Sequence, residues 1–464
     1  MSHYLAVDLG AESGRVMLGT LAGGRLALEE LHRFPNQPIQ LPTGLYWDSF
    51  RLFHEIVRGL TVAGRERKLQ IDGIGVDTWG VDFGLLGADG ALVDCPRHYR
   101  DARTEGVPER LFPVVSQEEL FTATGIQIMA INSLFQLYAM RLAEAPALRV
   151  AEKLLFMPDL LNYWLTGIAR SEVTIASTSQ CYDTTARCFA APLLEKLGLP
   201  TRILPELIQP GERLGSLLPA IGDATGLGPA PVYATAAHDT AAAIAAVPAS
   251  GDDWCYISSG TWSLMGVELP APIVNQTSRA LNYTNEAGAG GSTCLLKNIA
   301  GLWLLQECRR AWADAGESHS YDELIQMAEE AGPADELIDP DAFPQPGGMP
   351  ARIAAACSAR TKGQICRTIL ESLAARYREV LHGLESLTGR TIRTIHIVGG
   401  GSRNTLLNRL VAEATGRTVM AGPAEATAAG NILVQATGAG EISDTSEARD
   451  IVRRSFAIEV FEPR

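Results

Sequence analysis

The strongest constraint on the fold is a strand, a turn of small residues and a second strand, which the chain carries twice. In the first copy an apolar run from Tyr4 ends at Asp8 and Gly10, and a second apolar run follows Arg15. The second copy, 255–266, has the same order, with serine, glycine and threonine in its turn. Apolar runs bounded by turn residues predict buried strands. Because both halves open in this way, we expect two duplicated α/β domains with a ligand in the cleft between them.

A polar, helix-breaking stretch separates the two copies. The segment 247–253 contains one proline, one glycine, one serine and two aspartates. Such a composition is typical of a domain junction. The chain has 464 residues, enough for two or three domains with cores of their own. We therefore expect one domain over 1–245 and another over 253–464.

Hydrophobic periodicity and turn residues predict the further elements. Strands are expected near 4–9, 14–21, 25–33, 71–77, 232–236 and 391–398. Helices are expected over 48–60, 133–144, 158–166, 300–315, 364–387, 404–414 and 424–436. Asp48 can cap the first helix, and Gly389 ends the longest one.

Composition excludes several classes of partner. The formal net charge is −14, which argues against nucleic acid and against an anionic membrane surface. No apolar run reaches the length of a membrane span, and Asp8 and Glu12 interrupt any secretory signal. The eight cysteines lack paired metal spacing and are expected to be reduced thiols. These features predict a cytoplasmic protein with small-molecule ligands, either a monomer or a homodimer.

The first turn suits the phosphates of a nucleotide. Glycine in a turn lets phosphate oxygens approach the backbone N–H groups, and Asp8 at the end of the strand could hold Mg²⁺ through water. A plain hairpin also explains a turn with glycine and serine. The chain has no Gly-x-x-x-x-Gly-Lys-Ser/Thr segment, so a Walker-type phosphate loop is excluded.

Two stretches of the second half could hold the rest of a nucleotide. The turn 258–262 offers hydroxyl and backbone N–H groups, and three glycines at 399–401 stand between a predicted strand and a helix. Three glycines let the chain lie against a planar base or a ribose. A tight strand–helix turn is the plainer alternative.

Asp239 is the candidate general base. It follows a strand at the start of a predicted helix, where the helix dipole favours the carboxylate; a helix-capping role is an equally good interpretation. His238 is more often structural in such a setting. The segment 77–82 has two acids, a tryptophan and a glycine, which suit a sugar, although a hairpin with one buried tryptophan explains it too.

Six stretches together resemble the FGGY carbohydrate kinases of the actin-like superfamily, and they follow the order of that family. They are 7–18, 75–83, 238–240, 258–266, 297–306 and 396–401. The resemblance implies an α/β fold of two actin-like (ribonuclease H-like) domains, with mixed sheets flanked by helices and the active site in the interdomain cleft.

The resemblance also implies an activity, namely ATP-dependent phosphorylation of a ketose with Mg²⁺. L-rhamnulose, phosphorylated at O1 to L-rhamnulose 1-phosphate in L-rhamnose catabolism, is the expected acceptor. The alternatives are another ketose, such as L-fuculose or L-xylulose, and a non-catalytic ATP- or sugar-binding protein on the same scaffold.

The family's functional residues carry over to matching positions of this chain. Asp239 is then the general base, and Asp8 lies near Mg²⁺. The nucleotide contacts are Ala11, Glu12, Ser13, Gly14, Arg15, Thr261, Gln306 and Gly400. The sugar contacts are Gly80, His238, Asp239, Thr240 and Asn298. Glu12 departs from the small hydroxyl residue often found there, so we expect its side chain to face solvent.

Overall fold

The chain folds into two compact units, and neither is one continuous segment. The computed structural model describes residues 1–464. Unit 1 consists of Met1–Ala246, Glu268–Leu295 and Thr427–Ser455, and unit 2 of Val247–Val267, Leu296–Ala426 and Phe456–Arg464. The chain therefore leaves unit 1 after Ala246 and returns to it twice.

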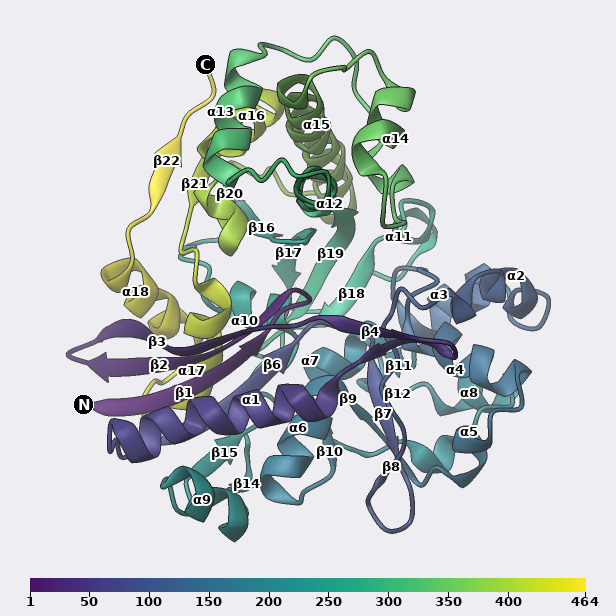
Figure 1. Ribbon diagram of the computed structural model, residues 1–464, viewed down its shortest axis with the longest axis vertical. Helices are drawn as coiled ribbons and strands as arrows, with labels where there is room; N and C mark the ends of the chain where they lie inside the picture. The colour runs from purple at the N-terminus through teal and green to yellow at the C-terminus, as the bar shows by residue number, and fades with distance from the viewer. The chain divides into compact units, whose positions relative to one another are not determined.

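Unit 1 is built on a six-stranded sheet in the order β14-β15-β6-β1-β2-β3. β1 pairs antiparallel with β2 but parallel with β6, so the sheet is mixed, as the resemblance implied. The three predicted N-terminal strands are the purple ribbons of Figure 1. The strands are β1 (Ser2–Leu9), β2 (Ser13–Ala22), β3 (Arg25–Pro35), β6 (Gly73–Thr78), β14 (Arg213–Ser216) and β15 (Pro231–Tyr233).

Helices α1 (Ser49–Thr61) and α17 (Ala426–Gly438) cover opposite faces of this sheet. A Cβ atom added to Gly59 of α1 would overlap the side chain of Val16, and one added to Gly19 would overlap Ile432 of α17. Val16 and Gly19 lie three residues apart on β2 and so point to opposite faces. The predicted cap is present, because Asp48 Oδ1 accepts a hydrogen bond from the backbone N–H of Arg51 at 3.2 Å.

The rest of unit 1 consists of short elements. Its strands are β4 (Pro38–Leu41), β5 (Gly44–Trp47), β7 (Phe83–Leu86), β8 (Leu92–Asp94), β9 (Lys153–Phe156), β10 (Arg170–Glu172), β11 (Tyr182–Asp183), β12 (Cys188–Phe189), β13 (Glu206–Ile208) and β18 (Thr284–Ala287). Its helices are α2 (Val107–Leu111), α3 (Gln117–Thr124), α4 (Ser133–Leu142), α5 (Pro146–Val150), α6 (Met157–Thr166), α7 (Val173–Ala176), α8 (Ala191–Lys196), α9 (Pro219–Thr225), α10 (Asp239–Ala245), α11 (Gln276–Ala280) and α18 (Thr445–Ser455).

The second sheet repeats the local pattern of the first. Its order is β18-β19-β17-β16-β20-β21-β22, and β16 pairs antiparallel with β17 but parallel with β20. In both sheets the first strand of a hairpin therefore pairs in parallel with a later strand. The strands are β16 (Trp254–Ser259), β17 (Trp262–Leu269), β19 (Thr293–Ala300), β20 (Thr394–Val398), β21 (Thr418–Ala421) and β22 (Glu459–Phe461).

The helices of unit 2 are dominated by α15, which is 27 residues long. It begins with a capping box between Thr361 and Gln364 and ends, as predicted, at Gly389, whose φ is 67°. Tyr377 on its buried face shares a 2.6 Å hydrogen bond with Ser263 of β17. The other helices are α12 (Trp303–Asp314), α13 (Tyr321–Glu330), α14 (Met349–Ala356) and α16 (Thr405–Thr415).

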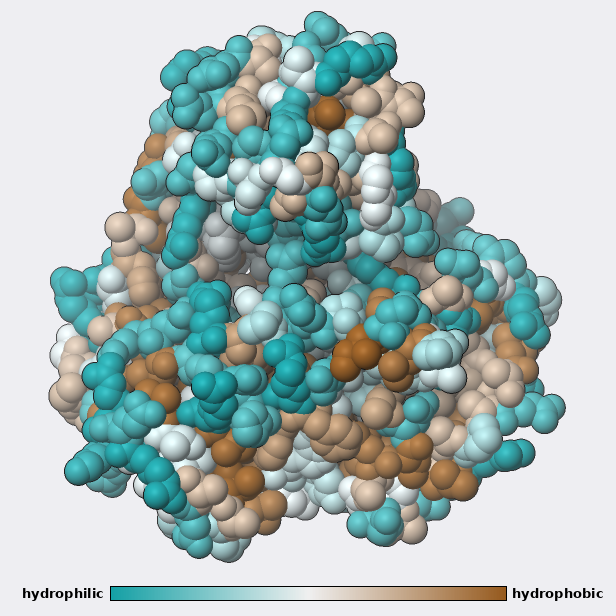
Figure 2. Space-filling model, in the orientation of Figure 1, coloured by the Kyte–Doolittle hydropathy of each residue, from teal (hydrophilic) through white to brown (hydrophobic).

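Exposed hydrophobic residues and helix length describe the surface. None of the helices has the length and apolar character needed to cross a bilayer. On the face shown in Figure 2, hydrophobic side chains form small groups among hydrophilic ones. The most exposed large hydrophobic residues include Phe50 of α1 and Leu41 of β4.

Candidate active site

Three carboxylates come together in unit 1 at the ends of neighbouring segments. Asp8 of β1 and Asp77 of β6 are directly paired in the parallel ladder. Asp239 begins α10, and the residue before it, His238, bridges to Thr78 at the end of β6. The carboxyl ends of parallel strands meet at one edge of a sheet, which is where ligands bind in open α/β folds.

Asp77 is a buried carboxylate with spare capacity for a hydrogen bond. Its Oδ2 accepts a 2.6 Å hydrogen bond from Asn431 Nδ2, while its Oδ1 has no partner. Burial raises the pKa of Asp77 well above its usual value; the charge of Asp8 raises it further, and the bond from Asn431 opposes the shift. Buried polar atoms are normally paired, so this edge of the sheet suits a ligand that donates hydrogen bonds.

The turn between β1 and β2 is held by two hydrogen bonds to and from Gly10. The Gly10 N–H donates to the Ser13 carbonyl at 2.9 Å, and Asn36 Nδ2 donates to the Gly10 carbonyl at 2.8 Å. Glu12 is exposed, which confirms the expectation for this residue. Arg15 lies opposite Asp8 in the hairpin and forms an ion pair with it, a contact that the sequence did not predict.

Asp239 is accessible, as a base must be. About a third of its side chain, 32%, is exposed, against 8% for Asp8. Thr240 Oγ1 donates to Asp239 Oδ1 at 3.2 Å, and His238 Nε2 lies 3.5 Å from the same oxygen. Burial raises the pKa of Asp239; the positive charge of His238 opposes this shift, and the charge of Asp8 adds to it. Asp239 is the first residue of α10 and not its N-cap, which is His238 and makes no side-chain cap.

Two buried glutamates support the chain around His238, and sequence analysis missed both. Glu172 accepts hydrogen bonds from the N–H groups of Thr174 at 2.9 Å and Ala237 at 3.1 Å. Glu286 Oε2 lies 3.2 Å from His238 Nδ1. Both glutamates come from segments distant in sequence from His238, and no local pattern distinguishes them from surface glutamates.

The loop at Gly80 is tightly packed and strained. A Cβ atom on Gly80 would lie 3.1 Å from Thr178 Oγ1, which is closer than most real contacts. The next residue, Val81, has a φ of 68°, and the Asp82 N–H donates back to the Gly80 carbonyl at 2.9 Å. Positive φ is costly for a β-branched residue, and such strain is concentrated at functional sites.

Within the predicted sugar-binding segment 77–82, Asp82 and Trp79 are buried and bonded to each other. Asp82 is buried and accepts hydrogen bonds from Trp47 Nε1 at 2.6 Å, Trp79 Nε1 at 2.9 Å and Gln136 Nε2 at 3.0 Å. Burial raises the pKa of Asp82 to about 6, against the effect of these donors. The carboxylate organises a buried tryptophan pair, whose ring centroids are 4.1 Å apart, and it also accepts a hydrogen bond from the Tyr99 N–H at 3.2 Å.

In unit 2, the β16–β17 turn and the start of α12 lie together. The Leu302 N–H donates to the Gly260 carbonyl at 3.0 Å, and the Trp303 N–H donates to the Thr261 carbonyl at 3.1 Å. One turn into α12, Gln306 has a buried Oε1 without a hydrogen-bond partner. Two of the predicted nucleotide contacts therefore come from directly bonded segments, and one of them carries an unpaired acceptor.

The three glycines after β20 have two different roles. A Cβ atom added to Gly401 would overlap the side chain of Ser259. A Cβ atom added to Gly399, whose φ is 83°, would lie 3.0 Å from the carbonyl oxygen of Ser259. These two glycines let the strand end pack on β16, as the plainer alternative required. A Cβ on Gly400 would meet nothing within 4 Å, so packing alone does not require glycine there.

The structure thus places the predicted residues in two groups. Unit 1 contains Asp8, Ala11, Glu12, Ser13, Gly14, Arg15, Gly80, His238, Asp239 and Thr240, and unit 2 contains Thr261, Asn298, Gln306 and Gly400. Asn298 is partly buried on β19.

Comparisons with known proteins agree with this arrangement over the whole chain. Models of the FGGY family of carbohydrate kinases match residues 3–246 (N-terminal domain) and 255–439 (C-terminal domain). The chain is 46% identical to a rhamnulokinase of Bacteroides thetaiotaomicron, covering 100% of this chain and 96% of that protein. It is 37% identical to a rhamnulokinase of Bacillus subtilis, covering 99% of this chain and 95% of that protein.

Solved structures share the fold at much lower identity. A ligand-bound xylulose kinase from Lactobacillus acidophilus has a TM-score of 0.83 at 15% identity, with 100% of this chain and 94% of that chain covered. Plasmodium falciparum glycerol kinase with ADP has a TM-score of 0.80 at 15% identity, with the same coverage. These similarities show the fold.

Proposed function

The chain belongs to the FGGY family of carbohydrate kinases, and from this premise we propose that it transfers the γ-phosphoryl group of ATP to O1 of L-rhamnulose. The products are L-rhamnulose 1-phosphate and ADP. One observation carries the choice of sugar: relatives named as rhamnulokinases match the chain over nearly its full length, at up to 46% identity.

Asp239 is proposed as the general base. Its carboxylate accepts the proton of the O1 hydroxyl while the bond from O1 to phosphorus forms and the bond from phosphorus to the ADP oxygen breaks. A base works best with a pKa near the operating pH, and the upward shift of the Asp239 pKa acts in that direction. Positioning and charge stabilisation supply most of the acceleration of phosphoryl transfer.

Asp8 is proposed to hold Mg²⁺ through water. Carboxylate oxygen is the donor that Mg²⁺ prefers, and the unpaired Oδ1 of neighbouring Asp77 is a suitable acceptor for the ion's water ligands. The ion would neutralise charge on the β- and γ-phosphates. Arg15, which the hairpin holds beside Asp8, adds a second positive charge at the same place.

The remaining predicted residues divide between the substrates. We propose that Ala11–Arg15 bind phosphates, that Thr261, Gln306 and Gly400 bind the nucleotide, and that Gly80, His238, Thr240 and Asn298 bind the sugar. In this proposal an N-terminal domain (1–245) supplies the base and the first phosphate hairpin, and a C-terminal domain (253–464) supplies the second hairpin and the adenosine contacts. We place this metabolic activity in the cytoplasm.

A panel of ketoses tests the proposed substrate. We expect kcat/KM to be highest for L-rhamnulose and about tenfold or more lower for L-fuculose and L-xylulose, because a lost hydrogen bond of 1.4 kcal/mol costs a factor of ten. ADP release in a coupled assay measures each rate. A flat panel, or one led by another ketose, would remove L-rhamnulose as the substrate and leave the kinase activity standing.

Substitution of Gly400 tests the nucleotide site. In Gly400→Ala the new methyl group meets no protein atom within 4 Å, so we expect unchanged thermal stability and a KM for ATP raised about tenfold by collision with the nucleotide. Gly416→Ala at the end of α16 is the comparison, since its methyl group also meets nothing within 4 Å although its positive φ costs some stability. An unchanged KM for ATP in Gly400→Ala would show that the nucleotide does not lie on this glycine.

A further inference from the structure

His238 lies between two carboxylates, one on each of its ring nitrogens. Its Nε2 is 3.5 Å from Asp239 Oδ1, and its Nδ1 is 3.2 Å from Glu286 Oε2. The side chains of His238 and Glu286 are 7% and 6% exposed, whereas that of Asp239 is 32% exposed. The imidazole is therefore a buried link between a second carboxylate and the accessible base.

The charges that face His238 are negative. They are Glu286 from β18, Asp239 from α10 and Glu172 from the end of β10. Burial lowers the pKa of His238, but these carboxylates, with Glu286 the strongest, outweigh it, so the pKa is raised. Asp239 in turn faces Asp8 and Asp77. His238 thus opposes the negative charge of this cluster on the Asp239 side, while Arg15 is paired with Asp8.

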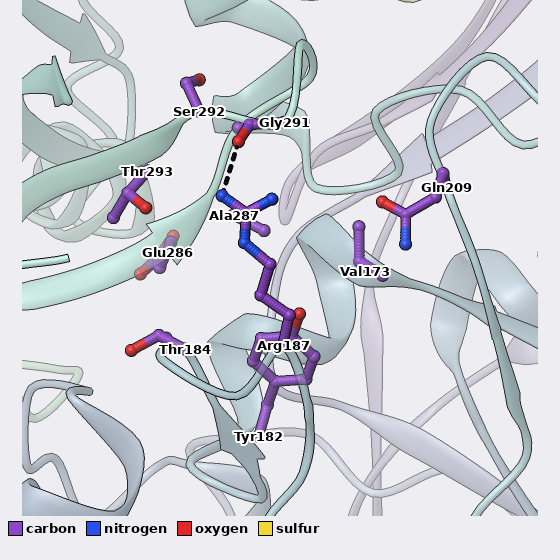
Figure 3. Close-up of a pocket in the computed structure, with 11 residues that line it drawn as sticks. Val173, Tyr182, Thr184, Arg187, Gln209, Glu286, Ala287, Gly291, Ser292 and Thr293 are labelled. Atoms are coloured by element: carbon purple, nitrogen blue, oxygen red, sulfur yellow. Dashed lines mark hydrogen bonds between the residues drawn. The ribbon is translucent and has the colours of Figure 1, made fainter. Parts of the chain in front are cut away.

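Glu286 also borders a cavity on unit 1. The cavity has a volume of about 150 Å³, enough for several water molecules. Figure 3 shows the Arg187 guanidinium reaching past the Glu286 carboxylate to the carbonyl of Gly291, to which it donates a 2.9 Å hydrogen bond. The Glu286 carboxylate therefore borders both this cavity and the His238 ring.

We propose that Glu286 is a positioning residue of the phosphoryl transfer: its carboxylate fixes the orientation of the His238 ring from the Nδ1 side, with Nε2 directed to Asp239. The inference rests on the proposed role of Asp239. It parallels the way in which a buried carboxylate orients a catalytic histidine in hydrolases, but here the histidine supports a neighbouring base.

Neutralising Glu286 has a defined electrostatic consequence. In Glu286→Gln, the strongest of the carboxylates that raise the His238 pKa is gone, so that pKa falls and the positive charge on the ring is reduced. Asp239 then loses part of the positive charge that lowers its pKa, while Asp8 still raises it. Since the base acts in its unprotonated form, kcat/KM rises with pH as Asp239 ionises. A higher Asp239 pKa therefore moves this acidic limb of the profile to higher pH.

The kinetic test compares Glu286→Gln with the wild type, using the whole chain with the preferred ketose, ATP and Mg²⁺. We expect kcat to fall roughly 10- to 100-fold, the range typical of residues that orient functional side chains. We also expect the acidic limb to shift upward and the KM for ATP to stay unchanged. Glu286→Asp should restore part of the rate and of the pH profile.

The matched control is Glu55→Gln. Glu55 is the carboxylate partner of another histidine, His32, at 2.6 Å, and lies on α1 outside the predicted site. Its loss should leave kcat and the pH profile unaltered. An acidic limb that stays in place in Glu286→Gln, or a kcat within twofold of the wild type, would overturn the proposal.

A second measurement does not depend on turnover. Imidazole NMR of ¹³C-labelled histidine follows the eight histidines of the chain, and the His238→Gln spectrum identifies the His238 signal. We expect the His238 pKa to fall in Glu286→Gln and to stay high in Glu55→Gln; an unchanged value refutes the inference. Failure of the wild type to phosphorylate any ketose would instead refute the proposed function.

Discussion

Replacing Asp239 by asparagine is expected to lower kcat roughly 10²- to 10⁴-fold, the usual loss when a general base is removed. The amide cannot take the proton of the sugar hydroxyl, yet it has almost the same volume as the carboxylate. Binding of ATP should therefore stay close to that of the wild type. The coupled ADP assay measures turnover, and isothermal titration calorimetry measures nucleotide affinity.

The control for this change is Asp48→Asn. Asp48 is also an acid at the start of a helix, where its carboxylate accepts a hydrogen bond from the N–H of Arg51 at 3.2 Å, but it stands before α1, away from the three carboxylates. We expect this variant to lose some stability and to keep its kcat. Normal turnover by Asp239→Asn would refute the assignment of the base and, with it, the proposed mechanism.

Gly430→Ala is expected to destabilise the protein by about 1–3 kcal/mol through overpacking. Gly430 lies in α17, where an added methyl group would overlap the backbone carbonyl of Ala242 in α10. Alanine is normally favoured over glycine within a helix by about 1 kcal/mol. The steric effect should win, because the obstacle is backbone and cannot change rotamer. Denaturant unfolding measures the loss.

The same variant should also lose activity, because α10 begins with Asp239. A displacement of about 1 Å at a catalytic group can cost 10²-fold in rate. Gly400→Ala serves as the stability control, since its methyl group meets no atom within 4 Å. A Gly430→Ala variant as stable and as active as the wild type would show that α10 and α17 do not pack as closely as described.

Local signals predicted the elements that local forces determine. The hairpin β1–β2, helix α1 with its Asp48 cap and helix α15 ending at Gly389 all follow the expected ranges within a few residues. Alternation of apolar residues, capping side chains and a left-handed glycine act over a few residues. Short strands such as β4 and β18 were missed because they lack such a signal.

The six stretches of sequence, in their order along the chain, by themselves determined the family and predicted the candidate site residues, because turn glycines, polar side chains and the apolar strands beside them are local features of the chain. Tertiary structure alone decided how buried polar groups are paired. It used Asp82 to hold two tryptophans, brought Asn431 to Asp77 and placed Glu286 against His238. Asp82 and Trp79 are close in sequence, but each of the other pairs joins segments far apart in the chain. The partner of a buried charged group is the residue that the tertiary fold places beside it, and a short stretch of sequence does not predict that residue.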